Sequence, residues 1–169
     1  MADEHVATYL NDHLAGSVAA LELLDHLEAA HPDGKLGDFF KRLRAEVAAD
    51  RGQLEELMRR LGVHESRARK ASAWLVQKMT ELKLRFDDPG GGSLLLFESL
   101  EALSLGIEGK QSLWIALEAA AEQSPVLRVA DYEQLRRRAQ EQRTQVEKLR
   151  IETARVVLTF DQLDRTKES

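Results

Sequence analysis

Apolar residues recur at alternating steps of three and four in four long stretches, and this spacing is the feature that most constrains the fold. The stretches cover residues 6–27, 40–61, 96–121 and 132–160. Such steps place the apolar side chains on one stripe of each α-helix. Long stripes of this kind are typical of helices that pack nearly parallel, at crossing angles of about 20°. We therefore predict an all-α, antiparallel four-helix bundle.

Proline and glycine divide the chain into helical segments. Pro32, Pro89 and Pro125 all lie in short polar or glycine-rich stretches between the periodic segments. The predicted helices cover about residues 3–31, 37–62, 66–86, 94–123 and 131–163 of a single domain, 1–169. The third is shorter and more basic than the others, and the linker "DDPGGGS" follows it. We expect this third helix to form a long crossover between the second and third helices of the bundle.

The composition indicates which classes of partner and which cellular compartment to expect. The chain has no cysteine and a net charge of -5, so thiolate chemistry is excluded and general nucleic-acid binding is not expected. No apolar run reaches the roughly 20 residues that a membrane span needs, and the first residues lack the features of a secretory signal. We expect a cytoplasmic protein. Trp74, between Lys70 and Lys78, is expected to pack on the bundle rather than on a membrane surface.

The order of a long helical pair, a long crossover and a second long pair resembles the ferritin-like superfamily. The segments "YLNDHLAGS", "AADRGQLEEL", "GIEGKQSLWIAL" and "RRRAQEQ" are similar to a bacterial family of small ferritin-like proteins of unassigned function. A di-metal site of that superfamily takes a Glu from each of two helices and Glu-x-x-His from the other two. The matching positions here are Asp50 with Gln53 and Glu147 with Arg150. Because both histidines are missing, we expect no metal and no cofactor.

Polar residues interrupt the apolar stripes near the middle of the predicted bundle. Counting from the turns near Gly34 and Leu127 brings Ser17 opposite Asp50 and Lys110 opposite Gln142. A buried carboxylate and a buried ammonium at one level should pair, since an unpaired buried charge costs several kcal/mol. The alternative is that both side chains reach solvent. The candidate cluster comprises His13, Ser17, Glu46, Asp50, Lys110, Gln142, Glu147 and Arg150.

Glycines within the predicted helices need a reason, because each costs about 1 kcal/mol relative to alanine. They are Gly16, Gly52, Gly106 and Gly109. Our interpretation is that neighbouring helices approach closely at these positions, and the alternative is a local kink in "GIEGK".

Three hypotheses for function follow. The first is a non-enzymatic structural or interaction module without catalytic residues, which binds an unknown protein partner or a second copy through residues 94–97, "LLLF". The second is a di-iron or di-manganese carboxylate protein with the atypical ligands His13, Glu46, Asp50, Glu101 and Glu147. The third is a binder of small molecules or lipids in a mid-bundle cavity that the glycines leave.

Overall fold

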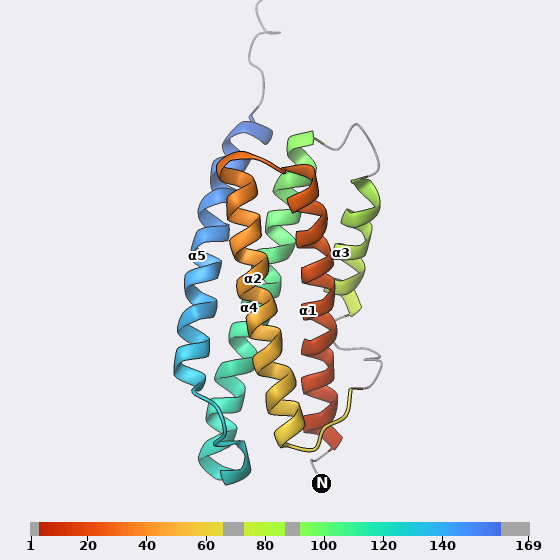
Figure 1. Cartoon of the computed structure of the whole chain (residues 1–169). Coiled ribbons are helices and arrows are strands. Elements are labelled where there is room, and N and C mark those ends of the chain that lie inside the picture. The colour runs from red at the N-terminus through yellow and green to blue at the C-terminus, as the bar shows by residue number, and fades with distance from the viewer. Residues whose placement is uncertain (1–3, 66–72, 87–91, 160–169) are drawn as a thin grey trace, which may run out of the picture.

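The computed structural model describes residues 4–65, 73–86 and 92–159, and this part of the chain is helical without strands. The α-helices are α1 (Glu4–Ala30), α2 (Gly34–Arg60), α3 (Ala73–Arg85), α4 (Gly92–Gln123) and α5 (Tyr132–Val157). A short 3₁₀ helix, η1 (Pro125–Leu127), lies between α4 and α5. Figure 1 shows the long helices side by side along one axis. The prediction of an all-α helical bundle is confirmed in these terms.

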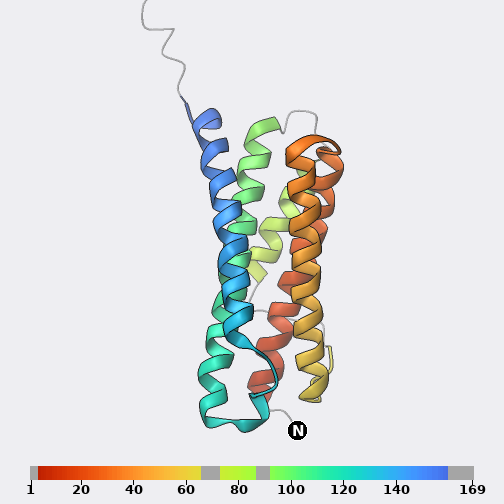
Figure 2. The same cartoon turned by 60° about the vertical axis from the view of Figure 1, so that its left-hand side comes forward.

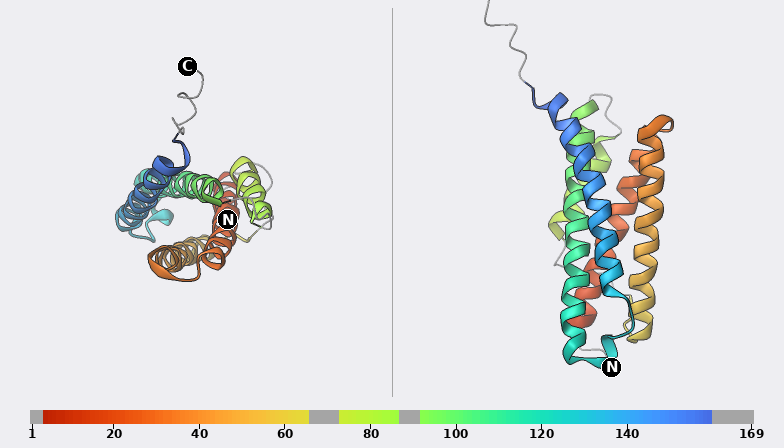
Figure 3. Two further views of the ribbon diagram at one scale, coloured as in Figure 1. Left: turned by 90° about the horizontal axis from the view of Figure 1, so that it is seen from above. Right: turned by 90° about the vertical axis from the view of Figure 1, so that its left-hand side faces the viewer.

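Two antiparallel helix pairs form the bundle. The most extensive packing is between α4 and α5 and between α1 and α2. The two pairs meet where α1 contacts α4, and α3 packs against the outside of both helices (Figures 1 and 2). The view along the axis places α2 and α5 on the side away from α3 (Figure 3). Because α3 lies between them in the chain, α2 and α4 run in the same direction (Figure 1).

Local sequence accounts for the ends of the helices. After α2, Gly62 has a φ of +67°, its N–H bonds the Arg59 carbonyl, and the Val63 N–H bonds the Met58 carbonyl. This is a Schellman motif, which requires a left-handed residue and favours glycine. At the start of α5, the Asp131 carboxylate accepts a hydrogen bond from the Gln134 N–H at 2.9 Å, as an N-cap residue does.

The predicted helix boundaries need several corrections. Helix α2 begins at Gly34, three residues before the predicted start, because Lys35 and Leu36 continue the helix from the Pro32–Gly34 turn. Helix α4 begins at Gly92 rather than residue 94. Helix α5 ends at Val157, where Val156 and Leu158 are exposed and gain nothing from packing. Residues 66–72 of the predicted third helix and 160–163 of the predicted last one lie outside the described residues.

The core is wider than the predicted stripes. The stripe of α2 is buried as expected, with Phe40 and Leu57 among its most enclosed residues. Helices α1 and α4 also bury residues outside their stripes, among them Leu14, Leu23 and Ala102. A second buried face is the consequence of α3, which packs on α1 and α4 in addition to their partners in the bundle.

The structure exposes less of residues 94–97, the proposed dimer surface, than we expected from the sequence. Leu95 is buried, Leu96 and Phe97 are half-buried, and only Leu94 is exposed, at 46%. Lys70 and the side chain of Trp74 lie outside the described residues. None of the helices in the described part combines the length and the apolar character that a membrane span requires.

Candidate functional site

A polar cluster in the middle of the bundle joins three helices. Lys110 Nζ, from α4, donates to Asp50 Oδ2 of α2 and to Gln142 Oε1 of α5. Gln142 Nε2 donates to Asp50 Oδ2 at 3.0 Å. Asp50 is only 3% exposed, and the side chain of Lys110 is 16% exposed. The structure therefore brings together three of the four residues that counting from the turns placed at one level, and their side chains do not extend into solvent.

Arg138 is a fourth member of this cluster, and sequence reasoning missed it. Arg138 lies on α5, and its Nη2 donates to Asp50 Oδ1. Two cations, Lys110 and Arg138, therefore contact one carboxylate. Arg138 lies in the basic segment "RRRAQEQ", beside the apolar stripe of the last helix. The available signal was that Arg138 precedes Gln142 by four residues, which places both side chains on neighbouring positions of one helix face.

Burial and neighbouring charges act on Lys110 in opposite directions. Burial lowers the pKa of Lys110 most, and the charge of Arg138 lowers it further. Asp50 raises this pKa through its charge and its hydrogen bond, and the charge of the half-buried Glu46 also raises it. The resulting pKa lies below the ordinary lysine value, because desolvation disfavours the ammonium form.

The two predicted residues of α1 lie near the cluster but do not bond to it. The Ser17 hydroxyl donates to the Leu14 carbonyl of its own helix at 2.6 Å, a common alternative for serine in a helix. His13 contacts Tyr9 in an edge-on arrangement, with 4.7 Å between the ring centroids. Burial lowers the pKa of His13, although the charge of Asp12 acts against this shift. The structure therefore places Ser17 and His13 of the candidate cluster outside its hydrogen-bonded part.

Glu147 and Arg150 form a separate ion pair on α5. Arg150 Nε and Nη2 donate to the two carboxylate oxygens of Glu147 at 2.9 and 2.8 Å. Glu101 lies 3.5 Å from Arg150, whose guanidinium also lies over the Phe97 ring. The Arg150 hydrogen bond, with a smaller contribution from Ser104, lowers the pKa of Glu147. These residues thus stabilise the α4–α5 pair and do not belong to the Asp50 cluster.

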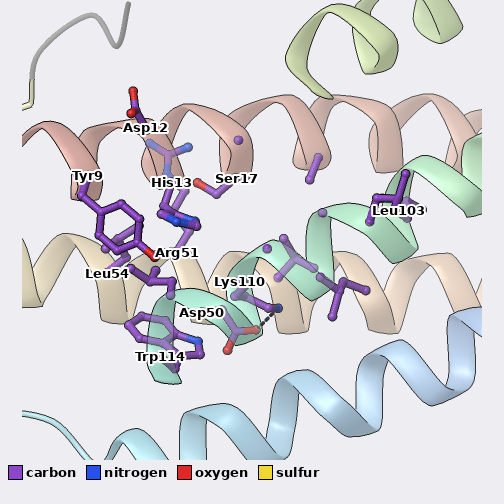
Figure 4. Close-up of a pocket in the computed structure, with 18 residues that line it drawn as sticks. Tyr9, Asp12, His13, Ser17, Asp50, Arg51, Leu54, Leu103, Lys110 and Trp114 are labelled. Atoms are coloured by element: carbon purple, nitrogen blue, oxygen red, sulfur yellow. Dashed lines mark hydrogen bonds and ion pairs between the residues drawn. The ribbon is translucent and has the colours of Figure 1, made fainter. Parts of the chain in front are cut away.

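A pocket of about 470 Å³ lies beside the cluster, between α1, α2 and α4. Figure 4 shows Tyr9, His13 and Ser17 on the α1 side, with Asp50, Lys110 and Trp114 on the other helices. The wall is mostly apolar. Its apolar and glycine residues are Gly16, Ala20, Val47, Leu54, Leu103, Leu105, Gly106, Ile107, Gly109, Leu113 and Trp114. Because Tyr9 and Leu105 in this wall are also exposed, the pocket reaches solvent beside them.

The helical glycines leave space rather than allow contact. A Cβ atom built on Gly16, Gly52 or Gly109 meets no atom within 4 Å outside its own surroundings. The predicted close approach of helices at these three positions is therefore wrong. Gly16, Gly106 and Gly109 all line the pocket, so missing side chains on α1 and α4 supply part of its volume. Gly52 is exposed and does not line it.

One buried polar atom in the pocket residues has no partner. The Nε1 atom of Trp114 is buried and makes no hydrogen bond within the described part of the chain. An unsatisfied buried donor costs about 1–3 kcal/mol. Trp114 itself is 1% exposed, so a hydrogen-bond acceptor could reach this N–H only from within the protein.

The donor set of the site does not suit a di-metal centre. Asp50 accepts hydrogen bonds from three side chains, two of them cationic, and Glu147 is paired with Arg150. Over residues 4–65, 73–86 and 92–159, no three His, Cys, Asp or Glu side chains are grouped so that they could hold a metal ion. Comparisons of the chain with protein-family models, with curated proteins and with solved structures give no match. The class that the fold and the site define is an all-α bundle with an apolar pocket and a buried charged cluster.

His13 makes the stability of this site depend on pH. Since burial lowers its pKa from 6.5, the unfolded chain takes up a proton first as the pH falls. The pKa shift of His13 therefore leaves the free energy of unfolding unchanged well above pH 6.5 and lowers it below pH 6.5. We expect His13→Gln to lose less stability than the wild type between pH 7 and pH 5 in urea unfolding. Part of the loss should remain in this variant, because burial also lowers the pKa of His31. A loss of stability between pH 7 and pH 5 equal to that of the wild type would show that His13 does not cause the pH dependence.

Proposed function

We propose that this chain is a ferritin-like bundle whose mid-bundle pocket binds a small, mostly apolar molecule. Two antiparallel helix pairs with a single crossover, and the parallel direction of α2 and α4 (Figure 1), support the ferritin-like part of the proposal. The observation that carries the binding function is the pocket itself. Its volume of about 470 Å³ lies within the range of about 300–1,000 Å³ that is usual for small-molecule sites.

The character of the wall favours this function over the other two hypotheses. Ligand sites are usually apolar with a few placed polar groups, and here Lys110, Asp50 and His13 supply such groups. A di-metal function would need Asp50 and Glu147 to be free of their cationic partners. An interaction module would favour an exposed apolar patch, but residues 94–97 are mostly covered.

Filling the pocket tests the proposal. The glycine at position 16 lines the pocket, and a Cβ atom there meets no atom within 4 Å, so Gly16→Leu should place its side chain in the pocket. We expect this variant to raise the Kd for the neutral apolar dye N-phenyl-1-naphthylamine by about tenfold, equivalent to 1.4 kcal/mol. Fluorescence titration of the folded protein measures this change.

Gly52→Leu is the matched control, because Gly52 also lies in a helix with open space about it but outside the pocket. It should bind the dye as the wild type does. Since loosely packed states expose apolar surface that also binds apolar dyes, both variants must retain the near-ultraviolet circular dichroism of the wild type. Equal dye affinity in folded Gly16→Leu and wild type would overturn the proposal.

A further inference from the structure

Lys110 holds its amino group at the boundary between the polar cluster and the apolar pocket. The residue lines the pocket (Figure 4), and its Nζ is bonded to Asp50 and Gln142. A lysine ammonium has three N–H bonds, and these two acceptors account for two of them. The nitrogen is therefore fixed in position by two partners and retains one direction of bonding for a molecule in the pocket.

The surroundings of Lys110 also suit the neutral amine that a nucleophile requires. Lysine becomes nucleophilic when it is desolvated in an apolar pocket or lies near a second cation. Both conditions hold, because the side chain is buried and Arg138 bonds the same carboxylate. Arg138 cannot lose its proton. Asp50 therefore keeps a cationic partner when Lys110 releases a proton. Burial lowers the pKa of Lys110 in the same sense.

We infer that Lys110 forms an imine with an apolar aldehyde that enters the mid-bundle pocket. The inference deepens the proposed binding function and rests on it. Asp50 first takes a proton from the Lys110 ammonium, and the Nζ lone pair then attacks the carbonyl carbon. The C–N bond forms as the carbonyl π bond breaks, and a proton moves from the nitrogen to the former carbonyl oxygen to give a hydroxyl group. This hydroxyl leaves as water with the proton that Asp50 returns, while the nitrogen lone pair forms the C=N bond. The net change converts an ammonium and an aldehyde into a protonated imine and one water.

The charge balance of the cluster does not change in this reaction. The protonated imine carries the same single positive charge as the ammonium, and its N–H can still donate to Asp50. The rest of the aldehyde would lie against the apolar wall, which includes Leu54, Leu103 and Ile107. The lining holds two carboxylates, Asp12 and Asp50, and two cations, Arg51 and Lys110. Because these charges balance, the class is a neutral aliphatic or aromatic aldehyde.

Reductive trapping tests the inference. The whole chain is incubated with octanal and cyanoborohydride, which reduces an imine to a stable amine, and peptide mass spectrometry locates the adduct. Lys110 should be modified at least about tenfold faster than the exposed Lys35 and Lys148, since the pocket holds the aldehyde beside it. An excess of 1-octanol, which has the same chain but no carbonyl group, should suppress the modification of Lys110 alone.

Two variants support the assignment. Lys110→Met should lose the fast modification, and Gly16→Leu should lose most of it while retaining the lysine. Displacement of the apolar dye by 1-octanol measures binding separately. If 1-octanol displaces the dye but Lys110 reacts no faster than Lys148, the imine is excluded and the binding function stands. If 1-octanol neither displaces the dye nor affects the modification of Lys110, both proposals fail.

Discussion

Replacing Asp50 with alanine should lower the free energy of unfolding by about 3 kcal/mol, the lower part of the range for breaking a buried ion pair. Asp50 is 3% exposed and holds Lys110, Arg138 and Gln142 together. Without its carboxylate, Lys110 has no anionic partner in contact among residues 4–65, 73–86 and 92–159. Arg138, whose side chain is 35% exposed, can turn toward water, and this relief is the reason for choosing the lower value.

Lys110→Met should cost less, about 1 kcal/mol, because Asp50 keeps its hydrogen bonds from Arg138 and Gln142. The double variant should be more stable than Asp50→Ala alone, since it removes the unpaired ammonium. Urea unfolding of the three variants, followed by circular dichroism at pH 7, gives the comparison. Losses below about 0.5 kcal/mol in both single variants, the size usual for surface substitutions, would mean that these side chains are solvated.

The cluster also bears on how the two helix pairs are joined. Helices α2 and α5 are not among the closely packed pairs, and side-chain hydrogen bonds from Arg138 and Gln142 to Asp50 cross between them. Arg60 of α2 adds a bond to the Val129 carbonyl just before α5. Loss of Asp50 therefore removes polar connections on the side of the bundle that α3 does not cover (Figure 3).

The sequence predicted the parts of the site that depend on helix periodicity and short turns. Asp50, Lys110 and Gln142 could be matched in level because each helix pair has a short connection, and counting from a turn then gives the height of each residue. Arg138 was missed because it lies beside the apolar stripe rather than on it. The second buried faces of α1 and α4 were missed because they depend on where α3 packs, which no local pattern specifies.

The sequence specifies the pocket less well than it specifies the polar cluster. A glycine in a helix is compatible with a close neighbour and with empty space, because the residue lacks a Cβ in either case. We expected a close neighbour at Gly16, Gly52 and Gly109, and the structure has open space there. Gly37, at the predicted start of the second helix, does meet a close neighbour.

Gly37→Ala should therefore lower the free energy of unfolding by about 2–3 kcal/mol, the upper part of the range for overpacking. A Cβ on Gly37 would lie 2.3 Å from the His31 carbonyl oxygen and 3.2 Å from the Pro32 carbonyl carbon. Both are backbone atoms of the turn between α1 and α2, so the chain itself has to move. Gly52→Ala is the control, because open space and a helical backbone predict a gain of about 0.5–1 kcal/mol. Urea unfolding distinguishes the two, and a stability of Gly37→Ala equal to or above that of the wild type would show that the turn yields at little cost.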